Sequence, residues 1–188
     1  VRLHPVKNHQ RGGISVADRL FFVSLQGLAG DRHRYEITEA GASLELPYDD
    51  MVVDSDVRLD LELDRTGTVL MARGDVTAES VMTCSRCLES FTIGMSPRFE
   101  VVIQMGDEKH QIEDEVTPPV DFVDDGVSFV ASVREALILA IPMKPLCDEG
   151  CSGLCQNCGA NLNLSSCDCP QEPADPRWDG LKILSEET

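Results

Sequence analysis

Residues 57–64 read Val-Arg-Leu-Asp-Leu-Glu-Leu-Asp, an unbroken alternation of apolar and charged side chains. Successive side chains of a β-strand point to opposite faces, so a period of two predicts a strand with one buried and one solvated face. Arg65, Thr66 and Gly67 come next and can close a tight hairpin turn. The stretch therefore predicts an antiparallel sheet.

The same alternation recurs on both sides of this hairpin. Upstream, the apolar run 20–25 and residues 33–37 are typical of strands, with turn-forming residues between them. Downstream, residues 68–72 and 76–82 alternate again. Glycine inside a strand often marks a break, so we expect Gly74 to divide these residues into two strands.

Two more alternating segments complete the series, 91–95 and 99–105, with Pro97 between them. Proline cannot donate to a strand ladder, so we expect the chain to break there. Short turns between successive segments favour pairing of neighbours. From about Leu20 to Met105 we predict an antiparallel meander or an open barrel.

The period changes after these strands. Residues 107–125 carry eight carboxylates against one lysine, which predicts a solvated acidic loop that can meet basic partners. From Ser128 onward, apolar residues recur at steps of three and four, which predicts a core-packing helix over 129–141. We expect Ser128 or Asp125 to cap it and Pro142 to end it. The fold class is then α+β, with one core helix.

The formal net charge of the chain is −17. Nucleic-acid affinity comes largely from Lys and Arg that neutralise phosphates, so any RNA contact must be local or pass through a basic protein partner. No apolar stretch approaches the roughly 18 residues of a membrane span, and we expect a soluble protein. Residues 1–19 look like a polar arm and lack the apolar core of a secretory signal, which predicts a cytoplasmic location.

The cysteines fall in closely spaced pairs. Cys84-x2-Cys87 ends a predicted strand, and six more cysteines lie among the 23 residues from Cys147 to Cys169. The segment 146–188 has too few apolar residues to fold by burial alone, so a further constraint such as a bound metal must hold it in shape. A two-residue spacing lets two sulfurs reach one ion at about 2.3 Å, and Gly159 after such a pair allows the tight turn. We predict a zinc-binding tail with one or two structural Zn²⁺ ions, whose ligands are Cys84, Cys87, Cys147, Cys151, Cys155, Cys158, Cys167 and Cys169.

Two pairings of these cysteines into Cys₄ sites stay open. The first gives the sets Cys84, Cys87, Cys155, Cys158 and Cys147, Cys151, Cys167, Cys169. The second gives the sets Cys84, Cys87, Cys147, Cys151 and Cys155, Cys158, Cys167, Cys169. In both, residues 84–87, here called the knuckle, are bound to the tail.

Other chemistries compete with zinc. An even cysteine count also suits disulfides, thiolates also bind Fe–S clusters, and a CxxC pair can be a redox centre in a thiol redox enzyme or a zinc-dependent redox sensor. The histidines are distant from the cysteines in sequence, and no phosphate loop, HExxH or GxSxG motif is present. We therefore expect no enzymatic activity and no small-molecule substrate.

Several motifs follow one another in a fixed order. They are Cys84-Ser-Arg-Cys87-Leu88, then Glu135-Ala-Leu-Ile-Leu-Ala-Ile-Pro142, then Cys147 and Cys151-Ser-Gly-Leu-Cys155-Gln-Asn-Cys158-Gly159 with Asn161-Leu-Asn163, then Asp175-Pro-Arg177. In these motifs the chain resembles the YceD family, the large ribosomal RNA subunit accumulation proteins, from Cys84 to Leu184 and more loosely from Leu20 onward. The resemblance implies a β-rich domain over 20–145.

What the resemblance implies is a non-enzymatic ribosome biogenesis factor that supports synthesis, processing or stability of large-subunit (23S) rRNA in a bacterium or plastid. Its partners would be the precursor large subunit, a basic ribosomal protein or rRNA. Arg86 in the knuckle can support metal-bound thiolates or contact phosphate. Asp175 and Arg177 are further binding candidates, although Pro176 can also start a short helix that Asp175 caps.

Overall fold

The computed structural model describes residues 19–26, 28, 32–46, 51–53, 55–105, 110–111 and 119–170, with the backbone alone at 51, 110 and 111. Most of the expected N-terminal arm lies outside these ranges. So do the end of the tail, Asp175 and Arg177.

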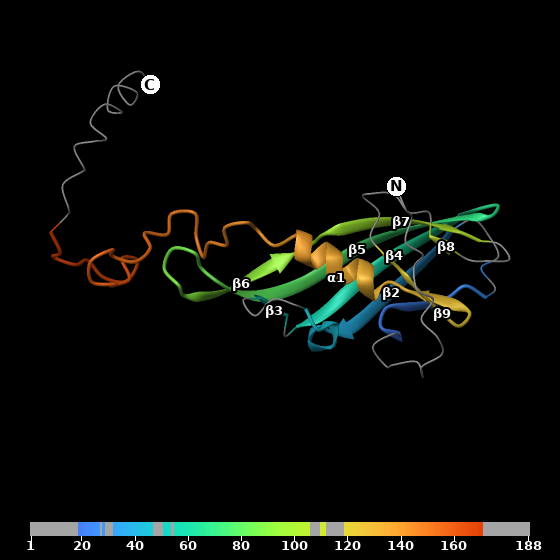
Figure 1. Ribbon diagram of the computed structural model, residues 1–188, viewed down its shortest axis with the longest axis horizontal. Coiled ribbons are helices and arrows are strands. Elements are labelled where there is room, and N and C mark those ends of the chain that lie inside the picture. Colours follow the sequence, from blue (N-terminus) through green and yellow to red (C-terminus); the bar gives the residue numbers. More distant parts are fainter. Residues whose placement is uncertain are drawn as a thin grey trace, which may run out of the picture.

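A long antiparallel hairpin runs through the centre of the molecule (Figure 1). One arm is β5 (Val69–Thr83), and the other consists of β6 (Ser90–Met95) and β7 (Arg98–Gln104). Both β6 and β7 pair with β5 in one continuous register, and only the two residues before Arg98 separate them. The backbone N–H of Val76 still donates to the carbonyl of Pro97 at 2.9 Å. The knuckle is the tip of this hairpin.

Further strands extend the sheet on both sides of the hairpin. They are β4 (Asp56–Thr66) and β3 (Met51–Val52) against β5, β2 (Arg32–Ala40) against β4, and β8 (His110–Gln111) against β7. A smaller sheet has the order β1 (Phe22–Ser24), β10 (Gly126–Ser128), β9 (Asp121–Val123). Every pair is antiparallel. The antiparallel arrangement is confirmed, and the large sheet is open, since no described residue pairs β2 with β8.

The alternation of residues 57–64 holds in three dimensions. Val57, Leu59, Leu61 and Leu63 are buried, while the opposite face carries cross-strand ion pairs such as that of Arg34 with Glu62. The helix α1 (Val130–Leu139) covers the buried face and contacts β5 and β7 (Figure 1). Exposed ion pairs contribute little, so burial on this one face is the main source of stability.

The helix differs from its predicted bounds of 129–141. Its N-cap residue is Phe129, which makes no side-chain capping bond. The hydroxyl of Ser128 accepts a bond from the Val130 N–H at 3.4 Å and donates to the carbonyl of Leu20 at 2.8 Å. Ser128 therefore ties the helix start to the small sheet from one position before the cap. A 3₁₀ turn, η2 (Gly41–Leu44), follows β2.

The predicted break at Gly74 is wrong. β5 runs through this residue, which pairs with Leu61 on one side and Phe99 on the other. A Cβ atom at this position would lie 2.3 Å from Cζ of Phe99. Glycine is needed here because the aromatic ring occupies the space of its missing side chain.

The acidic segment 107–125 is also more ordered than predicted. It contains β8 and β9, and β9 joins β10 through a two-residue turn at Asp124 and Asp125. Asp124 has a positive φ of 48°, a conformation that Asp tolerates in such turns. Residues 107–109 and 112–118 of the expected loop lie outside the described residues.

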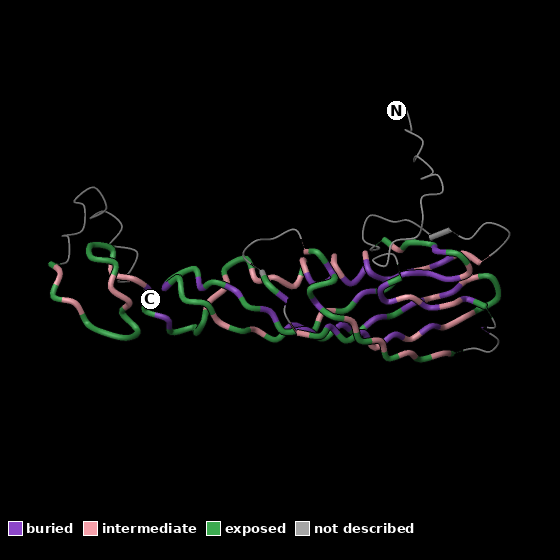
Figure 2. Tube along the Cα trace, turned by 90° about the horizontal axis from the view of Figure 1, so that it is seen from below, coloured by how far each residue is buried: buried purple, intermediate pink, exposed green. Residues whose placement is uncertain are grey.

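The degree of burial differs between the two ends of the molecule (Figure 2). Buried residues gather in the strands and α1, whereas the tail beyond the hairpin tip is mostly exposed or half-buried. Among the described residues, no helix is long and apolar enough to cross a membrane.

Candidate metal centres

The knuckle is a tight turn held by backbone bonds. Its ends meet where the Cys84 N–H donates to the carbonyl of Glu89 at 2.9 Å, and the Leu88 N–H donates back to the carbonyl of Cys84 at 3.0 Å. The Arg86 N–H points at the Cys84 sulfur at 3.5 Å. To close this turn, Leu88 adopts a φ of 60°, which is rare for a residue other than glycine.

The tail returns to this turn on two sides. The Ser85 N–H donates to the carbonyl of Pro145 at 2.9 Å, and the Leu154 N–H donates to the carbonyl of Arg86 at 3.1 Å. Nη1 of Arg86 donates to the carbonyls of Glu149 at 3.0 Å and Cys151 at 2.9 Å. Main-chain contacts thus place the tail against the hairpin tip.

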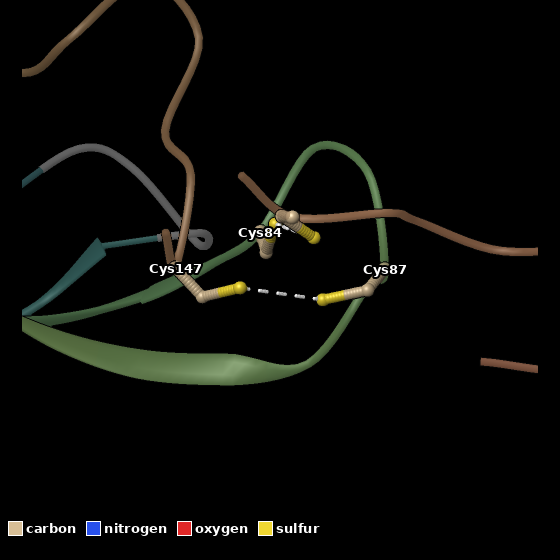
Figure 3. Close-up of side chains that lie close together, drawn as sticks. Cys84, Cys87 and Cys147 are labelled. Carbon is tan, nitrogen blue, oxygen red and sulfur yellow. Dashed lines mark hydrogen bonds between the residues drawn. The ribbon is translucent and has the colours of Figure 1, made fainter. Parts of the chain in front are cut away.

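These contacts gather four sulfur atoms, which we call the first tetrad: Cys84, Cys87, Cys147 and Cys151. All four lie within 4.8 Å of one another. Sγ of Cys87 is 3.6 Å from that of Cys147 (Figure 3), and Sγ of Cys84 is 3.8 Å from that of Cys151. Cys84, Cys87 and Cys151 are buried, together with the half-buried side chains of Phe91, Leu146 and Leu154.

The second tetrad, Cys155, Cys158, Cys167 and Cys169, is built from the tail alone. These sulfurs also lie within 4.8 Å of one another. The Gly159 N–H donates to the carbonyl of Cys155 at 2.9 Å, and Gly159 has a φ of 74°. Asn157 connects the start and the end of this segment, because its side-chain amide donates to the carbonyl of Pro170 at 2.9 Å. No member of this tetrad is fully buried.

The sulfur geometry fits a tetrahedral ion. Four thiolates at about 2.3 Å from Zn²⁺ stand about 3.8 Å apart, close to the separations within the first tetrad. The two tetrads are therefore clusters that can hold metal ions. They have the composition of closed structural sites, since no tetrad includes a His or carboxylate ligand.

The thiol pKa values point the same way. A backbone hydrogen bond from Cys87 lowers the pKa of Cys84 to about 6, and one from Cys158 lowers that of Cys155 to about 6. Desolvation and the adjacent Cys151 sulfur raise the pKa of Cys147 to about 12, and the Cys158 sulfur and burial do the same for Cys169. Four sulfurs this close cannot all ionise without a cation among them, and a bound divalent metal supplies that charge.

Of the two pairings left open by the sequence, the structure has the second. Arg86 bonds to tail carbonyls, so its guanidinium joins the knuckle to the tail. In the sequence, Asn163 belongs to a family motif that assigns it no role. Its amide donates to the Cys151 sulfur at 3.3 Å, and its oxygen accepts from the Ser152 N–H at 2.7 Å. The motif places Asn163 five residues after the Cys155-x2-Cys158 pair, and this spacing does not suggest contact with Cys151.

Comparison with known proteins places these features in a family context. Residues 72–185 match the family model described as large ribosomal RNA subunit accumulation protein YceD. The match begins inside β5 and includes the knuckle, α1 and all eight cysteines. No solved structure matches.

Individual relatives come from plants and mycobacteria. The chain is 27% identical to an Arabidopsis thaliana protein named large ribosomal RNA subunit accumulation protein YCED homolog 1, chloroplastic, over 70% of this chain and 49% of that protein. It is 31% identical to an uncharacterized protein of Mycobacterium tuberculosis strain H37Rv, over 69% of this chain and 63% of the relative. The chain thus spans about half to two thirds of the length of these relatives.

Proposed function

Because the chain belongs to the large ribosomal RNA subunit accumulation protein (YceD) family, we propose that it is a non-enzymatic factor in the biogenesis of the large ribosomal subunit. It supports the synthesis, processing or stability of 23S rRNA, and it acts on precursor particles through a basic ribosomal protein or rRNA. The family match over residues 72–185 is the observation that carries this proposal. The proposed place of action is the bacterial cytoplasm.

The proposed cofactor is structural zinc, one ion in each tetrad. Thiolate sets without an open ligand position favour Zn²⁺ among abundant divalent ions. Structural zinc contributes roughly 10–16 kcal/mol of apparent binding free energy in small peptides, which is enough to order a tail with little apolar burial. In this proposal the metal serves the fold, and the folded tail serves the ribosomal function.

Elemental analysis of the purified protein tests the metal. Two zinc ions per chain are expected, and their removal by a chelator should expose eight titratable thiols. Iron, or disulfide bonds between the tetrad cysteines, would overturn the zinc assignment. An absorption spectrum separates these outcomes because Fe–S clusters absorb visible light and zinc thiolates do not.

Depletion of the protein in its host tests the function. The ratio of 23S to 16S rRNA should fall, and the tagged protein should sediment with precursor large-subunit particles in a salt-controlled gradient. Unchanged 23S rRNA and sedimentation apart from every particle would rule the function out. Re-expression of the intact chain is the control that attributes any defect to this protein.

The alternative of a thiol redox enzyme or redox sensor gains no support. Each cysteine has three sulfur neighbours in a tetrad, an arrangement that suits a metal ion, whereas a redox pair consists of two cysteines. The named plant relative is described by rRNA accumulation and not by a redox activity.

A further inference from the structure

An apolar groove of about 600 Å³ lies between the knuckle and the end of α1. Its wall on the knuckle side includes Met82 and Leu88, and its wall on the helix side includes Ile138, Ile141 and Met143. The groove lies beside the first tetrad, and Cys84 is one of its lining residues. Nothing in the proposed zinc chemistry requires this apolar surface.

Two apolar side chains at the groove are strongly exposed, and one of them also has a strained backbone. Leu88 leaves 64% of its surface exposed while it holds a left-handed backbone conformation, and Met143 is fully exposed. A left-handed backbone is strained for a residue with a Cβ atom, whereas glycine would close the same turn freely. Backbone strain that presents an apolar side chain to solvent indicates a contact with another molecule.

The residues that line the groove are uncharged, and the knuckle end of the molecule around it has a net negative charge. Residues 84–89 and 140–170, which form the knuckle end of the molecule, contain two basic side chains against four carboxylates. Eight thiolates around two Zn²⁺ ions would add a net charge of −4. The last turn of α1, whose carbonyl end carries partial negative charge, contains no basic residue. An apolar groove in this setting complements a segment that carries both apolar and cationic side chains.

The described surface does not suit a phosphate backbone. Each arginine of the described residues bonds to a carboxylate, as Arg32, Arg58 and Arg98 do, or to backbone carbonyls, as Arg65 and Arg86 do. The remaining arginines are held in the same two ways. Among the lysines and arginines that the structure describes, Lys144 alone lacks such a partner. Phosphate binding needs clustered free cations, so the structure favours a protein over RNA.

We infer that the groove between the knuckle and the end of α1 docks a short basic segment of a ribosomal protein, anchored by an apolar side chain against Leu88 and Met143. This inference rests on the proposed function, because that function supplies a basic protein as the partner. Apolar anchors give such an interface its affinity, and the net negative charge of the knuckle end gives it orientation and speed of association.

The experiment uses the full zinc-loaded chain with a photo-crosslinking residue at position 143, or at position 164 as control. Leu164 is also strongly exposed but lies outside the groove. One probe is an rRNA-free preparation of large-subunit ribosomal proteins from the host, and the other is protein-free 23S rRNA. We expect position 143 to crosslink to one basic protein of the mixture, and position 164 to crosslink to it weakly.

Affinity for the crosslinked protein, then purified, completes the test. The double variant Leu88→Gly, Met143→Glu should raise its Kd by about tenfold or more, while Leu164→Glu should change it less than about twofold. Equal zinc content shows that all variants fold. Unchanged binding of the double variant, or crosslinking to rRNA instead of protein, overturns the inference.

If the double variant still sediments with precursor particles as the wild type does, the docking site is wrong and the proposed function stands. If the wild type itself fails to sediment, the function is wrong.

Discussion

Leu88 and Gly159 occupy the same place in two turns of the same kind. Each follows the second cysteine of a Cys-x2-Cys pair, has a positive φ, and donates its N–H to the carbonyl of the first cysteine of that pair. One turn therefore uses the residue that suits this backbone, and the other uses a large apolar residue in the same conformation. The difference separates a turn that only brings two cysteines together from one that also presents a side chain to solvent.

Exchanging the residue type at these two positions should have opposite effects. Gly159→Leu has free space for its Cβ, so only the left-handed backbone opposes it, and we expect a loss of about 1 kcal/mol in the free energy of unfolding. Leu88→Gly relieves the same strain but makes the unfolded chain more flexible, so we expect a change of less than about 1 kcal/mol. Denaturant titration in zinc-saturated buffer measures both. A large loss in Leu88→Gly would show that Leu88 is needed for the fold.

The two tetrads should lose metal independently. Cys84→Ser should retain one zinc ion, in the second tetrad, and Cys158→Ser should retain one in the first. Cys84→Ser should lower the melting temperature more, because the first tetrad joins the tail to the sheet. Native mass spectrometry counts the ions. Loss of both ions in either variant would contradict two separate sites.

A chelator should empty the second tetrad first. The first tetrad is largely buried and has bonds from Arg86 and Asn163 around it, while the second is open to solvent. Such outer bonds typically change metal affinity by about 10–100-fold. The Cys158→Ser chain, which keeps the first site, should release zinc to a colorimetric chelator about tenfold more slowly than the Cys84→Ser chain. Equal rates would mean that burial does not protect the first site.

Arg86→Ala should weaken zinc binding at the first tetrad by about tenfold without abolishing it. The substitution removes two hydrogen bonds to tail carbonyls and leaves all four ligands in place. Competition with a chelator of known affinity measures the change. Arg34→Ala is the matched control, because Arg34 makes an exposed ion pair on the sheet and should affect neither zinc affinity nor stability.

Gly74→Ala should destabilise the sheet by about 1–3 kcal/mol, because its methyl group meets the Phe99 ring and a methyl of Leu59. Gly94→Ala in β6 provides the control, since nothing lies within 4 Å of the new methyl group. Urea denaturation of the two variants compares them directly. Equal stability would show that the Phe99 ring can move aside at little cost.

Local patterns determined most of the secondary structure. Period-two alternation places Val57 to Leu63 on one face whatever the rest of the chain does, because side chains alternate along any strand. The pattern failed at Gly74, where glycine leaves space for the ring of Phe99, a residue distant in sequence. It also failed in the acidic segment, where backbone pairing with β7 and β10 forms short strands from residues of low strand propensity.

The sequence by itself determined that the chain contains antiparallel strands, one core helix and paired cysteines at metal-binding spacing, since each of these follows from neighbours along the chain. Only the tertiary structure decided which cysteines share a site. Sixty residues separate Cys87 from Cys147, and their approach depends on where the β5–β6 hairpin ends relative to the exit of α1. The spacing of residues cannot encode that distance, because packing of the helix on the sheet sets it.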